Sequence, residues 1–174
     1  MKLHPLFSRE QIAARVRELG ELVAAKLPED NTPTVAVILM KGALWFAADL
    51  LRHLPPTLRV EPVRVSSYGN ARTSSGQLTW HTPCPTCNGC RVLLVDDVLD
   101  TGLTLQAVQE ELRRNGATQV LTAVAVDKQG ARLTAVEADY AAFRVKSGFL
   151  VGYGMDCAEA YRNLPYIAEL SADE

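Results

Sequence analysis

Three aspartates and two threonines follow one apolar segment closely enough to form a single binding site. The segment Val92–Val95 is continuously apolar, as in a strand that is buried on both faces of a parallel sheet. Asp96 and Asp97 come directly after it, where we expect the strand to end, and the segment Asp100–Thr104 follows. In open α/β sheets, ligands bind at the carboxyl ends of strands, and phosphate groups favour helix N-termini. The pattern therefore predicts a phosphate site with carboxylates beside it.

These carboxylates indicate a ligand that carries hydroxyl groups as well as phosphate. Asp96 and Asp97 would repel a bare phosphate, but a carboxylate accepts hydrogen bonds from a sugar diol, and a divalent cation can bridge the diol and a second phosphate. Gly102 lets the backbone approach the ligand closely. We therefore expect a phosphorylated sugar. The alternative interpretation is a buried strand followed by a helix that Asp100 caps.

The string Val92–Leu105 resembles the phosphoribosyl-pyrophosphate (PRPP) motif of type I phosphoribosyltransferases. Three further segments resemble the hypoxanthine-guanine branch of that family: residues 39–50 its Lys-Gly loop and following helix, 66–76 its active-site loop, and 149–166 its purine-side segment. The resemblance implies an α/β type I phosphoribosyltransferase fold. In that fold a mostly parallel central sheet is flanked by helices, and the chain ends form a small hood.

The resemblance also implies how PRPP would be bound. Backbone amides of residues 100–104 would hold the 5′-phosphate, and two aspartates would hold the ribose hydroxyls directly or through Mg²⁺. Asp100 would lie near the proton on purine N7 and act as a general base. The peptide between Lys41 and Gly42 would be strained, with a cis bond as one alternative. The residues implied for PRPP and phosphate binding are Lys41, Gly42, Ser67, Tyr68, Asp96, Asp97, Asp100, Thr101, Gly102, Leu103, Thr104 and Arg162.

Three residues on the purine side and one metal-contacting residue match the family pattern. Phe149 would stack on the base, and the backbone of Leu150 would read its edge. Lys128 would donate to the oxygen at C6 and oppose an amino group there, which selects 6-oxopurines over adenine. Asp156 would contact Mg²⁺, together with Asp96 and Asp97, largely through water and ligand oxygens.

The expected function is purine salvage: hypoxanthine or guanine plus PRPP gives the nucleoside 5′-monophosphate plus pyrophosphate. One alternative is a phosphoribosyltransferase that prefers xanthine and guanine. Another is a regulator that binds PRPP or nucleotide without catalysis. Enzymes of this resemblance are commonly homodimers or homotetramers, so we expect one of these assemblies.

Composition is consistent with one globular domain over residues 1–174 and limits the partners. The net charge of −2 offers no basic footprint for nucleic acid. Apolar runs such as Val35–Met40 are too short to cross a bilayer. Charged residues break any signal-peptide core near the N-terminus, so we expect a cytoplasmic protein. Its expected partners are PRPP and a purine base, with no nucleic acid and no membrane.

Strand and helix patterns alternate along the chain, which favours a parallel sheet with flanking helices. Ser8 and Gln11 have the spacing of a capping box that opens a helix. Pro62 interrupts a strand pattern and indicates an edge position. The predicted elements are the helix after Ser8, strand 34–40, helix 44–54, strand 59–65, a mobile active-site loop at about 66–80, strand 91–96, helix 103–115 and strand 119–126.

One segment, residues 81–90, falls outside the family pattern. His81, Cys84, Cys87 and Cys90 lie at three-residue intervals. They could bind zinc or another thiophilic metal, and Cys84 and Cys87 could form a redox pair. The third interpretation is a variable loop without chemistry, and the sharp bend that one ion would require favours it.

Overall fold

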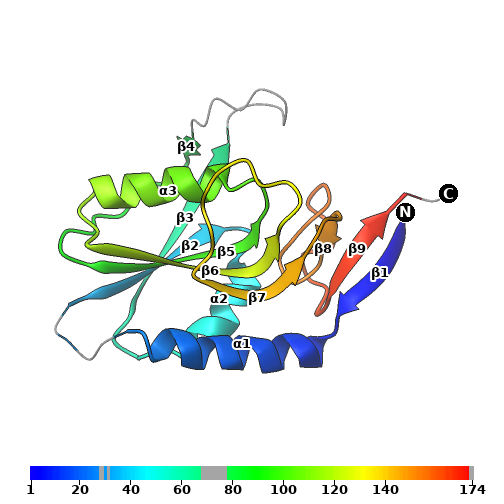
Figure 1. Ribbon diagram of the computed structural model, residues 1–174, viewed down its shortest axis with the longest axis horizontal. Coiled ribbons are helices and arrows are strands. Elements are labelled where there is room, and N and C mark those ends of the chain that lie inside the picture. Colours follow the sequence, from blue (N-terminus) through cyan, green and yellow to red (C-terminus); the bar gives the residue numbers. More distant parts are fainter. Residues whose placement is uncertain (28–29, 31, 68–77, 173–174) are drawn as a thin grey trace.

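A six-stranded sheet forms the centre of the molecule (Figure 1). The computed structural model describes residues 1–27, 30, 32–67 and 78–172. The strands lie in the order β4-β3-β2-β5-β6-β7. All neighbours pair in parallel except β4, which is antiparallel to β3, so the predicted mostly parallel sheet is confirmed. The bounds are β2 Thr34–Met40, β3 Arg59–Ser67, β4 Leu78–Trp80, β5 Arg91–Leu99, β6 Gln119–Lys128 and β7 Tyr140–Val145.

Helices cover both faces of this sheet. The helices α1 (Arg9–Ala24) and α2 (Leu44–Leu51) pack on one face, and α3 (Leu103–Arg114) packs on the other (Figure 1). Strand β5 serves both cores, because Leu93 and Val95 belong to the α1–α2 side while Val92 and Leu94 belong to the α3 side. This alternation explains why the strand is apolar at every position from Val92 to Val95.

The predicted start of α1 is confirmed in detail. The Ser8 hydroxyl accepts a hydrogen bond from the Gln11 backbone at 3.3 Å, and the Gln11 side chain accepts one from the Ser8 backbone at 2.8 Å. These two bonds satisfy amide groups that the first turn of a helix leaves without partners. The helix ends at Ala24.

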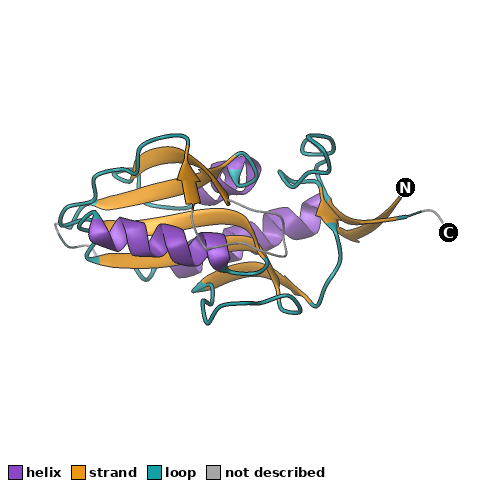
Figure 2. Cartoon of the chain, turned by 90° about the horizontal axis from the view of Figure 1, so that it is seen from above, coloured by secondary structure: helices purple, strands orange, loops and turns teal. Residues whose placement is uncertain are grey.

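The chain ends form the expected hood. Strands β1 (Lys2–Phe7), β9 (Ile167–Ser171) and β8 (Leu150–Val151) make an antiparallel sheet in the order β1-β9-β8. Figures 1 and 2 show this ribbon extending from one end of the central sheet. The pairing of β8 with β9 places the segment that begins at Phe149 beside the carboxyl ends of the central strands.

Several predicted boundaries were wrong, and one of them is the end of helix 103–115, since α3 ends at Arg114 and Asn115 is its C-cap. Strand β5 continues past residue 96 to Leu99, because its ladder with β6 continues through Val98 and Leu99. The predicted loop 66–80 is shorter, because β3 pairs with β4 through Val65–Ser67. Helix α2 ends at Leu51, and β6 extends to Lys128. The predicted edge position of Pro62 is confirmed, since from Arg59 to Val63 the described strands give β3 only β2 as a neighbour.

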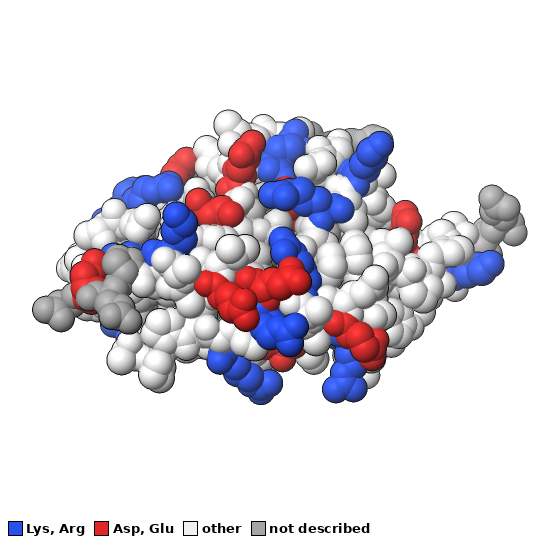
Figure 3. All heavy atoms as spheres, turned by 60° about the horizontal axis from the view of Figure 1, so that its bottom comes forward, with Lys and Arg blue, Asp and Glu red and all other residues white. Residues whose placement is uncertain are grey.

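Charge is mixed over the surface. On the face shown in Figure 3, acidic and basic side chains lie interspersed, in keeping with 18 Lys and Arg against 20 Asp and Glu. None of the helices in the described ranges combines the length and the apolar character that crossing a membrane requires.

Candidate active site

Two neighbouring carboxylates lie near the carboxyl end of β5, inside the strand rather than after it as predicted. Asp96 and Asp97 are both partly buried, and the Asp97 amide donates to the Asp96 carboxylate at 2.9 Å. Loss of water and the adjacent Asp97 carboxylate raise the pKa of Asp96 well above its usual range. Sugar hydroxyls or a cation at this pair would relieve the repulsion between the two carboxylates.

A short loop links these acids to the N-terminus of α3. Gly102 is the N-cap residue and adopts φ 85°, a left-handed conformation that glycine tolerates. Asp100 is therefore not the cap, and the alternative interpretation of that residue is wrong. The hydroxyl of Thr101 accepts a hydrogen bond from the Leu103 amide at 3.4 Å. A hollow of about 290 Å³ is lined here by Asp96, Asp97, Val98, Leu99, Asp100, Thr101, Gly102, Thr104 and Leu105.

A second hollow, of about 190 Å³, adjoins the first and shares Asp97, Val98 and Asp100 with it. In it Lys128, at the end of β6, donates to Asp100 Oδ2 at 2.8 Å. Asp100 Oδ1 is buried and has no hydrogen-bond partner among the described residues. Phe149 also lines this hollow, and the residue is 53% exposed, so a ligand can reach it. The remaining lining residues are Leu150, Met155 and Asp156.

The loop between β2 and α2 lies directly against the acidic pair. Gly42 has no room for a side chain, because a Cβ there would overlap the Asp97 carboxylate. The cis peptide bond is Met40–Lys41, so the alternative of a cis Lys41–Gly42 bond was wrong by one residue. Lys41 donates to Glu159 at 2.8 Å. This ion pair connects the loop to the segment after β8.

That segment supplies a carboxylate and a guanidinium. Asp156 Oδ1 lies 2.7 Å from an Arg162 nitrogen, and Arg162 also donates to the Gly154 carbonyl at 2.8 Å. Three residues between 157 and 162 have positive φ, namely Ala158, Glu159 and Tyr161. Such conformations are strained in residues other than glycine, and they cluster at functional sites.

The structure brings most of the predicted site residues together. Lys41 and Gly42 lie in the loop after β2, Asp96 and Asp97 lie near the end of β5, and Thr101, Gly102, Leu103 and Thr104 lie where α3 begins. Asp100, Lys128, Phe149, Leu150 and Asp156 line the adjoining hollow, and Arg162 pairs with Asp156 at its border. Ser67 is the last residue of β3. Tyr68 lies outside the described residues, as does most of the predicted active-site loop.

The cysteines of residues 81–90 pack against the end of α3. Cys87 and Cys90 are buried in the α3-side core, and the Cys87 amide donates to the Asn115 carbonyl at 3.1 Å. His81 pairs with Ser66 at 2.8 Å. Within the described residues no three His, Cys, Asp or Glu side chains are grouped to hold a metal ion, and the four cysteines are free. Burial raises the pKa of Cys84 to about 11.

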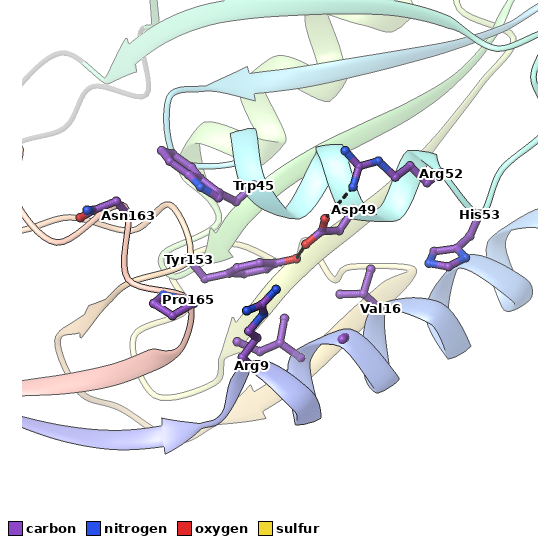
Figure 4. Close-up of a pocket in the computed structure, with 11 residues that line it drawn as sticks. Arg9, Val16, Trp45, Asp49, Arg52, His53, Tyr153, Asn163 and Pro165 are labelled. Carbon is purple, nitrogen blue, oxygen red and sulfur yellow. Dashed lines mark hydrogen bonds and ion pairs between the residues drawn. The ribbon is translucent and has the colours of Figure 1, made fainter.

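A different hollow, of about 430 Å³, lies between α1 and α2 (Figure 4). Its one carboxylate, Asp49, accepts a hydrogen bond from the Tyr153 hydroxyl at 2.8 Å and pairs with Arg52 at 3.5 Å. This hollow is lined by none of the predicted site residues, so it is not the candidate active site. The Tyr153 bond instead fastens the segment after β8 to α2.

Two residues that contact the site were missed in the sequence. Glu159 bridges Lys41 and Arg162, and its three-residue spacing from both Asp156 and Arg162 was an available signal. Arg132 donates to the Asp100 carbonyl at 3.0 Å from the segment between β6 and β7. No motif marks Arg132, because its contacts with the site are to backbone atoms.

The fold and the site define a class: an α/β protein whose acidic pair and helix N-terminus lie together at the carboxyl ends of its strands, where such folds bind their ligands. The profile of the family described as "Phosphoribosyl transferase domain" matches residues 8–157. The chain therefore belongs to the phosphoribosyltransferase family.

Similar proteins indicate which branch of this family the chain resembles. The hypoxanthine-guanine phosphoribosyltransferase of Bacillus subtilis is 39% identical over 95% of this chain and 91% of its own length, and that of Streptococcus thermophilus is 35% identical over 97% and 93%. Among solved structures, a hypoxanthine phosphoribosyltransferase from Staphylococcus aureus matches with a TM-score of 0.90 and 31% identity, covering 97% of this chain and 91% of that one.

Proposed function

We propose that this chain transfers the phosphoribosyl group of PRPP to hypoxanthine or guanine in purine salvage. The products are the nucleoside 5′-monophosphate and pyrophosphate. The single observation that supports this best is the Lys128–Asp100 pair at 2.8 Å in a hollow bordered by Phe149. In this arrangement the Lys128 ammonium can donate to the 6-oxo group of a purine, and the Asp100 carboxylate can accept a proton from the same base. Both groups line the hollow that Phe149 borders.

Each chemical step has a candidate group. A purine nitrogen attacks the anomeric carbon, and the bond from that carbon to the pyrophosphate oxygen breaks with its electron pair. Positive charge builds on the sugar ring, as in glycoside cleavage. Asp100 Oδ1 is buried without a partner in the described part of the chain, so it can accept the proton that the base loses. Lys41 and Arg162 would neutralise the departing pyrophosphate.

The sugar phosphate would be bound by the N-terminus of α3. The amides from Asp100 to Thr104 precede or open this helix, where backbone N–H groups and the helix dipole favour an anion. Asp96 and Asp97 would hold the ribose hydroxyls. The two hollows adjoin through Asp97 and Asp100, so one ligand can place its phosphate in the first and its base in the second.

Mg²⁺ fits the oxygen ligands present. Asp96, Asp97 and Asp156 supply the carboxylates that a hard cation prefers, and the described residues form no closed cage of three ligands. An ion bound largely through ligand and water oxygens suits that arrangement. When bound near Asp96, Asp97 and Asp156, Mg²⁺ would neutralise charge on the departing pyrophosphate.

The alternatives make different demands on the same site. A preference for xanthine and guanine would be set at the 2-position, which backbone groups near Leu150 would read. A regulator without catalysis would bind PRPP or nucleotide but would have no use for a proton acceptor such as Asp100 Oδ1 beside Lys128. We favour the enzyme on this ground, and we also infer cytoplasmic residence and a homodimer or homotetramer.

A product assay with PRPP, Mg²⁺ and four bases in parallel tests the proposal. We expect monophosphate and pyrophosphate from hypoxanthine and guanine, less from xanthine and only slow, measurable turnover of adenine. The variant Lys128→Gln serves as the matched test of specificity, since it removes the ammonium and should lower the ratio of hypoxanthine to adenine use about tenfold. PRPP binding without turnover of any base would support the regulator instead.

A further inference from the structure

We propose that Arg132 is the positioning residue that sets the geometry of the Lys128–Asp100 pair. This inference rests on the proposed function, and none of the roles given above uses Arg132. The residue lies between β6 and β7, four positions after Lys128. Its side chain is 19% exposed, which is low for an arginine and requires partners for its five N–H donors.

The guanidinium donates to the main chain of both residues that form the pair. Its Nε lies 3.0 Å from the carbonyl oxygen of Asp100, and its Nη2 lies 3.2 Å from the carbonyl oxygen of Lys128. These carbonyls belong to two separate elements, the loop after β5 and the end of β6. One rigid, planar group therefore joins the two elements at the residues whose side chains pair.

Arg132 is itself held in one place. Nη1 donates to the Val136 carbonyl at 2.6 Å, and Nη2 pairs with the carboxylate of Asp127, which is 13% exposed. The neighbouring Leu133 amide donates to the Thr101 carbonyl at 2.9 Å. The segment after β6 is thus hydrogen-bonded to the loop of residues 100–102. Within this segment, Arg132 contacts the carbonyl groups of both Asp100 and Lys128.

The close packing of this segment makes the arrangement specific. Gly102 adopts positive φ, and a Cβ at that position would overlap Thr134 and touch the Arg132 side chain. The loop of residues 100–102 and the segment 132–134 are therefore in direct contact. Hydrogen-bond reach to a base spans only a few tenths of an ångström, so a loss of this support would move Asp100 and Lys128 out of line.

The test compares Arg132→Ala with Arg144→Ala in the full-length protein. Arg144 approaches the same Asp127 carboxylate at 3.6 Å, but its side chain is 60% exposed, so it offers a matched control. For Arg132→Ala we expect kcat/KM for hypoxanthine to fall about 100-fold, mainly in kcat. The ratio of hypoxanthine to adenine use should fall about tenfold. Millimolar guanidinium chloride should restore part of the activity, and methylammonium chloride should not.

Three results would overturn the proposal. They are equal effects of the two variants, an unchanged base ratio in folded Arg132→Ala, and a loss of activity that guanidinium does not reverse. If Arg132→Ala does not fold, Arg132→Lys decides: it keeps the charge beside Asp127 but cannot reach both carbonyls, so the same fall in kcat and in the base ratio is expected. A wild-type protein that turns over none of the four bases would instead refute the proposed function.

Discussion

Single residues in the site are paired with opposite charges before any ligand binds. Glu159 accepts from Lys41 at 2.8 Å and lies 3.4 Å from Arg162, which also pairs with Asp156. The bond from Lys41 lowers the pKa of Glu159 below its usual range. Glu159 therefore holds two cations that are expected to meet pyrophosphate, and a bound pyrophosphate would share or replace this carboxylate.

Replacing Asp100 with asparagine tests the proton acceptor. The amide keeps the shape of the side chain but cannot take up a proton, so Asp100→Asn should lower kcat by about 10²–10⁴-fold. The dissociation constant of PRPP should stay within about threefold. Single-turnover kinetics and equilibrium binding measure the two effects separately. The control is Glu110→Gln on the exposed side of α3, and an unchanged kcat in Asp100→Asn would remove the base role.

The partly buried thiol of Cys84 should react slowly with alkylating reagents. Burial raises its pKa to about 11 from a reference value of 9.0. Because only the thiolate reacts, alkylation of native Cys84 by iodoacetamide at pH 8 should be about 100-fold slower than that of an unperturbed thiol. Peptide mass spectrometry of timed samples measures this rate, and the denatured chain is the control. Rapid modification of Cys84 in the native protein would contradict the burial argument.

At the residue scale, the sequence indicated those residues that lie in continuous motifs. Asp96, Asp97 and Asp100 follow one strand, so their proximity needed only the strand itself. Lys128 and Phe149 needed the family resemblance, because their neighbours come from other elements. Arg132 could not be predicted, since its partners in the site are carbonyl groups and every residue carries one.

At the scale of elements, three strand ends and one helix start create the site. The ends of β2, β5 and β6 are neighbours because those strands are adjacent in the sheet, and α3 begins where β5 has ended. Hydrophobic patterns predicted these elements well, since both faces of the sheet are buried. The continuation of β5 and the three-residue β4 were missed, because they depend on pairing with a partner strand rather than on apolar periodicity.

The start of α3 depends on Gly102, and Gly102→Ala should disrupt it. The substitution forces alanine into φ 85° and makes its Cβ overlap Thr134. We expect a KM for PRPP at least about tenfold higher and a loss of about 1–2 kcal/mol in unfolding free energy. Gly89→Ala is the matched control, since Gly89 has φ 70° but open space around it. That control should lose stability to a similar extent while the KM for PRPP stays unchanged.

If both variants raise the KM for PRPP equally, the effect would come from lost stability alone. The steric argument at Gly102 would then be wrong. If only Gly102→Ala raises the KM for PRPP, the contact between the loop of residues 100–102 and segment 132–134 is needed for PRPP binding.

At the scale of the whole molecule, two sheets meet at the site. The central sheet carries the residues proposed to bind the phosphate and the sugar, and the hood carries Phe149 and Leu150 through the pairing of β8 with β9. The Tyr153–Asp49 bond fastens the hood segment to α2 (Figure 4). The close approach of Gly154 to the Gly42 carbonyl adds a second contact with the central part. The site therefore depends on contacts between residues more than a hundred positions apart.

Ligand binding should accordingly stabilise the whole fold. With Mg²⁺ present, PRPP at 100 times its Kd should add about 2.7 kcal/mol to the unfolding free energy. Chelating the metal should remove most of this gain, because Mg²⁺ would neutralise the charge of the pyrophosphate beside the site carboxylates. Thermal unfolding measures the effect. Ribose 5-phosphate, which lacks pyrophosphate, is the control, and its binding should depend little on Mg²⁺. Equal stabilisation by PRPP with and without Mg²⁺ would exclude this role of the ion.

The outer side of β3 bears on how copies of this chain meet in a crowded solution. A strand border with free N–H and C=O groups can recruit a strand from another molecule and start aggregation. Pro62 has no N–H to offer, and Arg59 and Glu61 form an exposed ion pair at 3.2 Å along the same stretch. Pro62, which indicated the edge position of β3, therefore also disfavours pairing of β3 with a strand of another molecule.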